Sequence, residues 1–171
     1  MISIVGIGNG ASAIAEKFEQ YPQYKVYKLN DKIERSAGRK RRLKSYDDPE
    51  EYEKNIPSLK KYFAKVDDHV QVFVIGSSYS SSYTLGILEQ IKGKKIDVFY
   101  VKPDTDLLTG IPKLIENAVC GVLQEYARSG VFNSITLLSN KKLEEAIGDV
   151  PIKKFYDYLN ETIASTIHYL N

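Results

Sequence analysis

The chain has 171 residues, of which 43% are hydrophobic and 27% are charged, and its formal net charge is +2. This length suits one compact domain, and the ordinary apolar content excludes a disordered chain. No apolar run approaches the roughly 18–20 residues of a membrane span, so we expect a soluble, cytoplasmic protein without a membrane partner. The small net charge argues against a uniformly basic nucleic-acid binder.

The N-terminal residues are typical of a phosphate-binding α/β domain. A short run of β-branched apolar residues breaks into a turn that contains Gly6, Gly8 and Gly10. Glycine permits positive φ and close backbone approach, so unpaired N–H groups at the start of the next helix can face an anion. The third glycine of a dinucleotide fingerprint is missing, because Ala11 or Ser12 stands there. The turn predicts either a phosphate-binding loop or a tight connection between strand and helix.

The rest of the chain alternates between expected helices and strands. Strands are expected at 25–29, 70–75, 96–101 and 134–138, and helices at 11–19, 58–65, 85–91, 113–128 and 152–170. With the N-terminal run, these about five strands predict a doubly wound, mostly parallel sheet with helices on both faces. Ligands of such folds bind beyond the carboxyl ends of the strands, which makes Asn30 and Asp31 candidate contacts to a ribose or a base.

The strongest local charge pattern lies between residues 33 and 57. The basic residues expected to contact a partner or a phosphate are Arg35, Arg39, Lys40, Arg41 and Arg42, and an acidic block follows at residues 47–53. A basic block of this kind binds phosphate, nucleic acid or an acidic protein surface. The alternative is a solvated segment whose charges the acidic block partly neutralises.

Residues that would support other chemistry are few. Cys120 is the one cysteine, which makes an intrachain disulfide impossible, and we interpret it as a core residue of an expected helix. His69 and His168 are isolated in the sequence, so they suggest neither a metal site nor a catalytic triad. We therefore expect no catalytic residue and no metal ligand.

The order of these elements and several motifs resemble the nucleotide-binding half of the tubulin/FtsZ family. Residues 100–103, Tyr-Val-Lys-Pro, resemble the family's Thr-Lys-Pro-like strand end. Residues 138–143 resemble its Ile-Pro-Asn-Asp-(Lys/Arg)-Leu-Leu segment, and residues 154–160 resemble part of its long connecting helix. The glycine-rich residues 6–12 and the strand end at 29–31 are similar to its first phosphate loop and its Asn-Thr-Asp sequence.

The resemblance implies a single GTPase-domain fold over residues 1–171 that ends in the connecting helix at about 152–170, with the second family domain absent. It also implies GTP or GDP with Mg²⁺ as ligands, if the site is retained. The residues that would then bind the nucleotide are Gly8, Asn9, Gly10, Asn30, Ser80, Ser81, Ser82, Asn140 and Asn160.

The sequence departs from the family where its Gly-Gly-Gly-Thr-Gly-(Thr/Ser)-Gly signature is expected. Residues 77–83 read Ser-Ser-Tyr-Ser-Ser-Ser-Tyr instead. Serine tolerates the backbone angles of such a loop poorly, and either Tyr79 or Tyr83 is large enough to fill the phosphate pocket. Asn160 also replaces the aspartate that reads guanine, and an amide is a weaker acceptor than a carboxylate. These departures predict a degenerate nucleotide site.

Several functions remain open at this point. The first is a non-catalytic, non-polymerising regulatory module that needs no cofactor and binds another protein machine, as a viral or accessory component. A viral module would act in the host cytoplasm. The second is a guanine-nucleotide-binding protein with weak or no GTPase activity. The third is a nucleic-acid-associated factor that uses the stretch Arg35–Lys44. A dinucleotide-binding Rossmann enzyme is a fourth alternative, because Asp31 ends the second strand.

Overall fold

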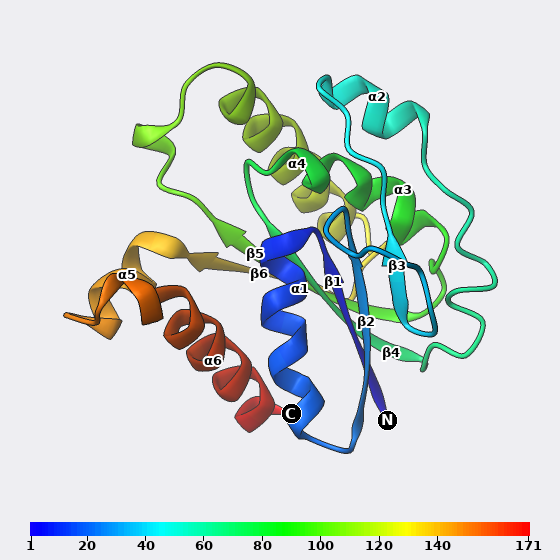
Figure 1. The fold of residues 1–171 in the computed structure, drawn as a ribbon. Coiled ribbons are helices and arrows are strands. Elements are labelled where there is room, and N and C mark those ends of the chain that lie inside the picture. The colour runs from blue at the N-terminus through cyan, green and yellow to red at the C-terminus, as the bar shows by residue number, and fades with distance from the viewer.

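A six-stranded, all-parallel sheet forms the centre of the protein in the computed structural model, which describes residues 1–171 apart from the side chain of Ile152 (Figure 1). The strands run in the order β3-β2-β1-β4-β5-β6. They are β1 (Ile2–Ile7), β2 (Tyr24–Asn30), β3 (Lys40–Arg42), β4 (His69–Ile75), β5 (Lys95–Lys102) and β6 (Ser134–Ser139). The predicted α/β architecture with a parallel sheet is confirmed, with one strand more than expected.

Helices cover both faces of the sheet. They are α1 (Asn9–Glu16), α2 (Pro49–Lys54), α3 (Thr84–Glu89), α4 (Gly110–Arg128), α5 (Asn140–Ile147) and α6 (Ile152–Leu170), with the 3₁₀ turns η1 (Lys17–Gln20), η2 (Tyr79–Tyr83) and η3 (Thr105–Leu107). Figure 1 shows α1 and α6 on one face and α2, α3 and α4 on the other. No helix among the described residues combines the length and apolarity that a membrane crossing requires.

The central strands are apolar on both faces because both faces are covered. In β1, Ile4 packs in the cluster beneath α1 and α6, whereas the next residue, Val5, packs in the cluster beneath α2, α3 and α4. Ile4 lies opposite Val26 of β2 and Gln71 of β4. The alternation of side chains along each strand therefore supplies two separate cores from one sheet.

The segment 58–65 is not the helix that its apolar spacing predicts. It forms turns in which only the Phe63 N–H donates to the carbonyl four residues earlier, that of Leu59 (2.9 Å). Both side chains are buried as the spacing requires, so one turn of chain is enough to place them. The Gln90 side chain accepts from the Leu59 N–H (2.7 Å), a bond between segments that the local sequence does not reveal.

Both histidines have structural partners. The Nδ1 atom of His168, near the end of α6, lies 2.8 Å from the Tyr24 hydroxyl, and its ring stacks on Tyr21. His69, at the start of β4, lies 2.6 Å from an Asp97 carboxylate oxygen. Cys120 is buried in α4. The histidine contacts fix α6 against β2 and join β4 to β5 near the amino ends of these strands.

Candidate functional site

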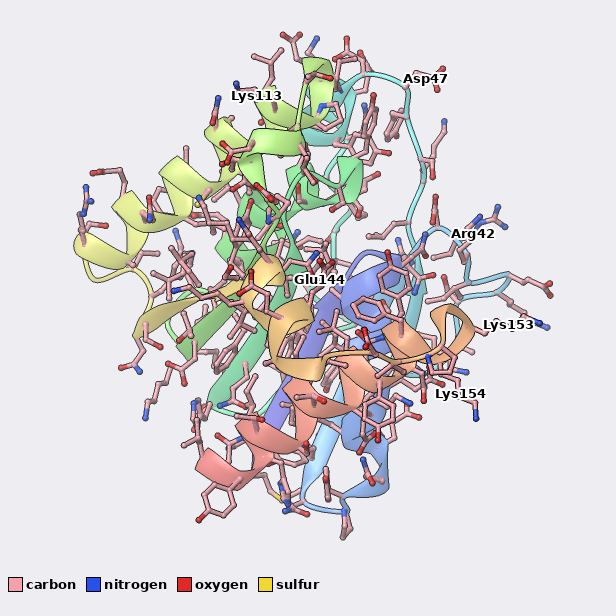
Figure 2. All side chains as sticks on the ribbon, turned by 90° about the vertical axis from the view of Figure 1, so that its left-hand side faces the viewer. Arg42, Asp47, Lys113, Glu144, Lys153 and Lys154 are labelled. Carbon is pink, nitrogen blue, oxygen red and sulfur yellow. The ribbon has the colours of Figure 1, made fainter. Side chains whose placement is uncertain are left out.

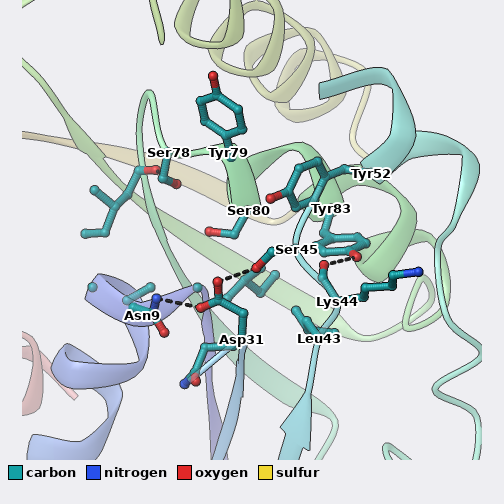
Figure 3. Close-up of a pocket in the computed structure, with 16 residues that line it drawn as sticks. Asn9, Asp31, Leu43, Lys44, Ser45, Tyr52, Ser78, Tyr79, Ser80 and Tyr83 are labelled. Carbon is teal, nitrogen blue, oxygen red and sulfur yellow. Dashed lines mark hydrogen bonds between the residues drawn. The ribbon is translucent and has the colours of Figure 1, made fainter. Parts of the chain in front are cut away.

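The chain order in the sheet reverses between β1 and β4, and a cavity of about 250 Å³ lies beyond the carboxyl ends of these strands (Figure 3). The connections after β1 and β4 leave in opposite directions at such a point, which opens a crevice where ligands of α/β proteins bind. The cavity is bordered by the start of α1, the end of β2, the segment before α2, and η2. The sheet topology therefore selects this crevice as the candidate site.

The start of α1 has the backbone geometry of an anion site. Gly8 has φ +98°, and its N–H donates to the Leu29 carbonyl (2.7 Å). No side chain caps α1, and Asn9 and Gly10 both border the cavity. Uncapped first-turn N–H groups and the helix dipole together favour a negative charge at this place. The turn that the glycines predict is thus present.

The loop after β4, which contains η2, closely approaches the glycine turn after β1. A Cβ atom built on Gly8 would lie 2.4 Å from the Ser80 hydroxyl oxygen. Ser80, in η2, therefore stands beside the glycine turn and narrows the space in front of α1. Serine also tolerates this loop better than expected, since Ser77 adopts a left-handed backbone with φ +64°. The expectation that serine would avoid such angles is wrong at this residue.

Residues 43–46, which we call the strap, lie in the connection from β3 to α2, and the first three of them border the cavity. The Ser45 hydroxyl donates to one Asp31 carboxylate oxygen, and the Asn9 side-chain amide donates to the other (2.7 Å). On the opposite side, the Tyr83 hydroxyl donates to the Lys44 carbonyl (2.6 Å). The hydrogen bond from Ser45, helped by that from Asn9, holds the pKa of Asp31 below its ordinary value despite partial burial. The strap is therefore tied to β2 and to η2 (Figure 3).

Three tyrosines line the cavity on the side of α2 and η2. Tyr52 packs edge-to-face on Tyr83, with ring centroids 4.8 Å apart, and lies 6.4 Å from the Tyr79 ring. Tyr83 is buried, and burial raises its pKa to about 12. Both tyrosines of the 77–83 segment thus border the crevice, as expected from their size. They supply a largely apolar wall.

The structure brings five of the nine proposed nucleotide contacts together and leaves the other four elsewhere. Gly8, Asn9, Gly10, Asn30 and Ser80 line the cavity.

The remaining four proposed contacts have other environments. The buried Ser81 hydroxyl donates to the Ser78 carbonyl (2.6 Å), and Ser82 lines a groove between α2 and α4. Asn140 begins α5, where its amide donates to Glu144 (3.2 Å), and Asn160 lies within α6. Neither asparagine lines the crevice. Asn140 is distant because α5 follows the edge strand β6, three strands away from β1. These four residues do not form one site with the glycine turn.

The sequence names Lys44 only as the end of the basic stretch Arg35–Lys44, and it does not place Lys44, Ser45 or Tyr52 at the crevice. All three line the cavity. They follow an unpredicted strand and belong to a segment that the sequence marks only as charged. Asn30, in contrast, lines the cavity, as its position at the end of β2 predicts. Its side-chain oxygen already accepts hydrogen bonds from the Lys32 and Ile33 N–H groups (3.0 Å each).

The basic stretch forms an exposed edge of the sheet. Lys40, Arg41 and Arg42 make up β3, which pairs with β2, and Arg35 and Arg39 lie in the connection before it. Among the described residues, none of these five side chains forms an ion pair with a carboxylate. The Arg41 Nε atom is buried without an acceptor in the described chain. Figure 2 shows Arg42 and Asp47 pointing outward at well separated places. The acidic block does not neutralise the basic edge.

The comparisons with known proteins support the fold. No family model and no curated protein matches the chain. Among solved structures it is similar to the FtsZ dimer of M. jannaschii, with a TM-score of 0.74 and 14% identity over 97% of this chain and 52% of that chain. It thus spans about half the length of that FtsZ chain.

Dehydrogenases share the architecture less closely. The TM-score is 0.50 with an aldohexose dehydrogenase of Thermoplasma acidophilum, at 13% identity over 98% of this chain and 88% of that chain. The TM-score is 0.51 with a short-chain dehydrogenase/reductase of Vibrio parahaemolyticus, at 13% identity over 98% of this chain and 91% of that chain. The higher TM-score favours FtsZ over these Rossmann-like neighbours. The protein therefore has a tubulin/FtsZ-like α/β fold.

Proposed function

We propose that the protein is a non-catalytic, non-polymerising module with a degenerate tubulin/FtsZ-like nucleotide site, and that it acts by binding another protein. The observation that carries this proposal is the strap, which is tied to Asp31 on one side and to Tyr83 on the other. These hydrogen bonds keep a segment of the chain itself along the crevice where a nucleotide would bind.

The size and polarity of the crevice support this proposal. Its volume of about 250 Å³ lies below the range of roughly 300–1,000 Å³ that is usual for small-molecule sites. Asp31, the carboxylate on its wall, has both oxygens engaged, and Lys44 is the one cation among the described lining residues. Phosphoryl transfer requires positioned water and stabilised phosphate charge, to which this lining contributes little. A rigid sheet that presents loops on its surface suits a binding module.

Calorimetric titration with GTP, GDP and ATP in the presence of Mg²⁺ tests the proposal, together with a phosphate-release assay. We expect neither heat of binding nor turnover, because the tied strap, Ser80 and the tyrosines line the crevice and leave it smaller than a usual ligand site. An Asn140→Ala variant serves as a matched control and should give the same silent titration. Micromolar binding of a guanine nucleotide that weakens in Asn140→Ala would contradict the proposal and favour a nucleotide-binding protein.

The basic edge favours nucleic-acid binding as a second candidate function. Its cations form no ion pairs within the described chain, and four of them, Arg35, Arg39, Lys40 and Arg42, are exposed to phosphates in solution. Such binding is driven by the release of counterions and falls steeply as salt increases.

Fluorescence anisotropy with labelled single-stranded and duplex DNA and RNA measures this second function. Any affinity at about 50 mM salt should fall by orders of magnitude at about 200 mM, and the double variant Arg41→Glu/Arg42→Glu should abolish it. The control Lys141→Glu/Lys142→Glu changes the same charge on the exposed start of α5 and should matter far less. Equal binding by both double variants would exclude the basic edge as the nucleic-acid site.

A further inference from the structure

A groove of about 560 Å³ lies between α2 and the N-terminal half of α4, apart from the crevice. Figure 1 shows these two helices next to each other at the top of the molecule. The α4 side of the groove is formed by Ile111, Leu114, Ile115, Ala118 and Val119. These positions follow the i, i+3, i+4, i+7, i+8 spacing of one helix face, so the groove has a continuous apolar wall.

Only part of this apolar face serves the core. Ile115 and Val119 are buried, with 3% and 4% of their surface exposed. Leu114 and Ile111 remain 68% and 41% exposed, and Leu107, in the turn before α4, is 79% exposed. A helix that only covered a sheet would carry polar residues on this flank. Neighbouring exposed apolar side chains of this size are characteristic of an interaction surface.

The opposite wall of the groove is acidic. It is formed by Asp47, Asp48, Pro49, Glu50 and Glu53. Asp48 caps α2 by accepting from the Glu50 N–H (3.0 Å). None of these four carboxylates forms an ion pair with a described cation, and the described lining of the groove contains no Lys or Arg. The wall therefore presents uncompensated negative charge beside an apolar surface.

We propose that this groove binds a basic amphipathic helix of a partner protein. Its apolar side chains would cover Leu114 and Ile111, and its Lys or Arg residues would pair with the carboxylates of α2. The apolar wall extends over nine residues of α4, about 12 Å, which corresponds to about two turns of a bound helix. An amphipathic helix laid in an apolar groove is a common mode of peptide recognition, and complementary charge sets its orientation. This inference rests on the proposed function, because it names the partner that the module takes.

A pair of synthetic helical peptides tests the groove in the full chain. Each peptide has about 18 residues and a leucine face, and its other face carries lysines in one peptide and glutamates in the other. In a fluorescence anisotropy titration, we expect the Leu/Lys peptide to bind at least about tenfold more tightly than the Leu/Glu peptide. Equal affinity for the two peptides would overturn the proposal.

Substitutions in the groove locate the binding. Leu114→Glu should lower the affinity for the Leu/Lys peptide by at least about tenfold. Leu170→Glu, at a residue of comparable exposure (76%) at the end of α6, should leave that affinity unchanged. The double variant Glu50→Lys/Glu53→Lys should reverse the preference between the peptides. All of these side chains are exposed, and circular dichroism verifies that each variant is folded. If neither Leu114→Glu nor the charge reversal changes the affinity for the peptides, the peptide binds elsewhere and the inference is overturned.

The two proposals fail in different ways. If the nucleotide titration gives no heat and neither peptide binds, the proposal that the groove binds a basic helix is contradicted, but the proposed non-catalytic module is not. Nucleotide binding contradicts the degenerate nucleotide site of the proposed module, whatever the peptide result. Sedimentation equilibrium separates a foreign partner from a second copy of the chain. A self-association that Leu114→Glu abolishes would assign the groove to a second copy and overturn the inference.

Discussion

Gly6→Ala is expected to destabilise the protein by more than about 3 kcal/mol, and Gly6→Val is expected to prevent folding. A Cβ atom on Gly6 would lie 2.6 Å from the Ala11 carbonyl oxygen and 2.8 Å from the Ser12 Cα. These are backbone atoms of α1, so no side chain can rotate to relieve the overlap. The helix would have to move away from β1, and the packing of its buried residue Ile14 would be lost.

Urea unfolding followed by circular dichroism measures this effect. Gly121→Ala is a matched control, since Gly121 is exposed within α4 and a Cβ there would meet no atom within 4 Å. This control should stabilise the protein by about 0.5–1 kcal/mol, because alanine is the better helix former. An unfolding midpoint of Gly6→Ala equal to that of the wild type would show that α1 does not approach the sheet as closely as described.

The close approach at Gly6 also positions the candidate site. The same short turn that brings α1 onto β1 directs its uncapped N-terminus at the cavity, beside Gly8 and Asn9. A displaced helix would separate Asn9 from Asp31, to which its side-chain amide now donates (2.7 Å). Stability and site geometry therefore depend on the same glycine.

The parts of the fold that the sequence predicts are those in which one local pattern determines the structure. β1, β4 and β5 are apolar on both faces, and α4 carries a 3.6-residue period. β3 has neither signal, because Lys40, Arg41 and Arg42 are all charged. It is a strand because its backbone pairs with Lys28–Asn30 of β2, and such charges are typical of a sheet edge.

In the candidate site, too, some residues follow from a local sequence pattern, whereas others depend on contacts between distant segments. The residues found from sequence, such as Gly8 and Asn30, stand at the ends of strands, where the topology of the sheet fixes their place. The strap depends on contacts across long stretches of sequence, since Tyr83 lies 39 residues after Lys44. The serines were predicted as one group, yet η2 has about three residues per turn. Ser80 and Tyr83 therefore share a side and both reach the cavity, whereas Ser81 does not.

Raising the pH above about 10 is expected to unfold the protein, with a loss of at least about 3 kcal/mol of stability per pH unit. Burial raises the pKa of Tyr83 to about 12. Burial, and then the hydrogen bond that its hydroxyl donates to the buried Glu116, also raises the pKa of Tyr100. Burial raises the pKa of Tyr62 in the same way.

The direction of this effect follows from proton binding. Above about pH 10 the unfolded chain releases its tyrosine protons, whereas the folded protein keeps those of Tyr83 and Tyr100. The folded state then binds more protons, so its stability is complete below the ordinary tyrosine pKa and decreases as the pH rises toward the folded values. Each buried tyrosine contributes about 1.4 kcal/mol per pH unit. The loss by about pH 12 is comparable with the whole stability of a typical domain.

Tyr83→Phe connects this pH dependence to the strap. At neutral pH the variant loses the hydrogen bond to the Lys44 carbonyl and should be less stable by about 1 kcal/mol. Between about pH 10 and 12, however, its stability should fall less steeply than that of the wild type. The two slopes should differ by about 1.4 kcal/mol per pH unit, the contribution of one buried tyrosine. Tyr169→Phe removes a hydroxyl from a residue that is 89% exposed and should change neither value. Urea unfolding at several pH values measures both slopes. Equal slopes in the two variants would mean that Tyr83 ionises freely in the folded protein, which a strap held by its hydroxyl does not permit.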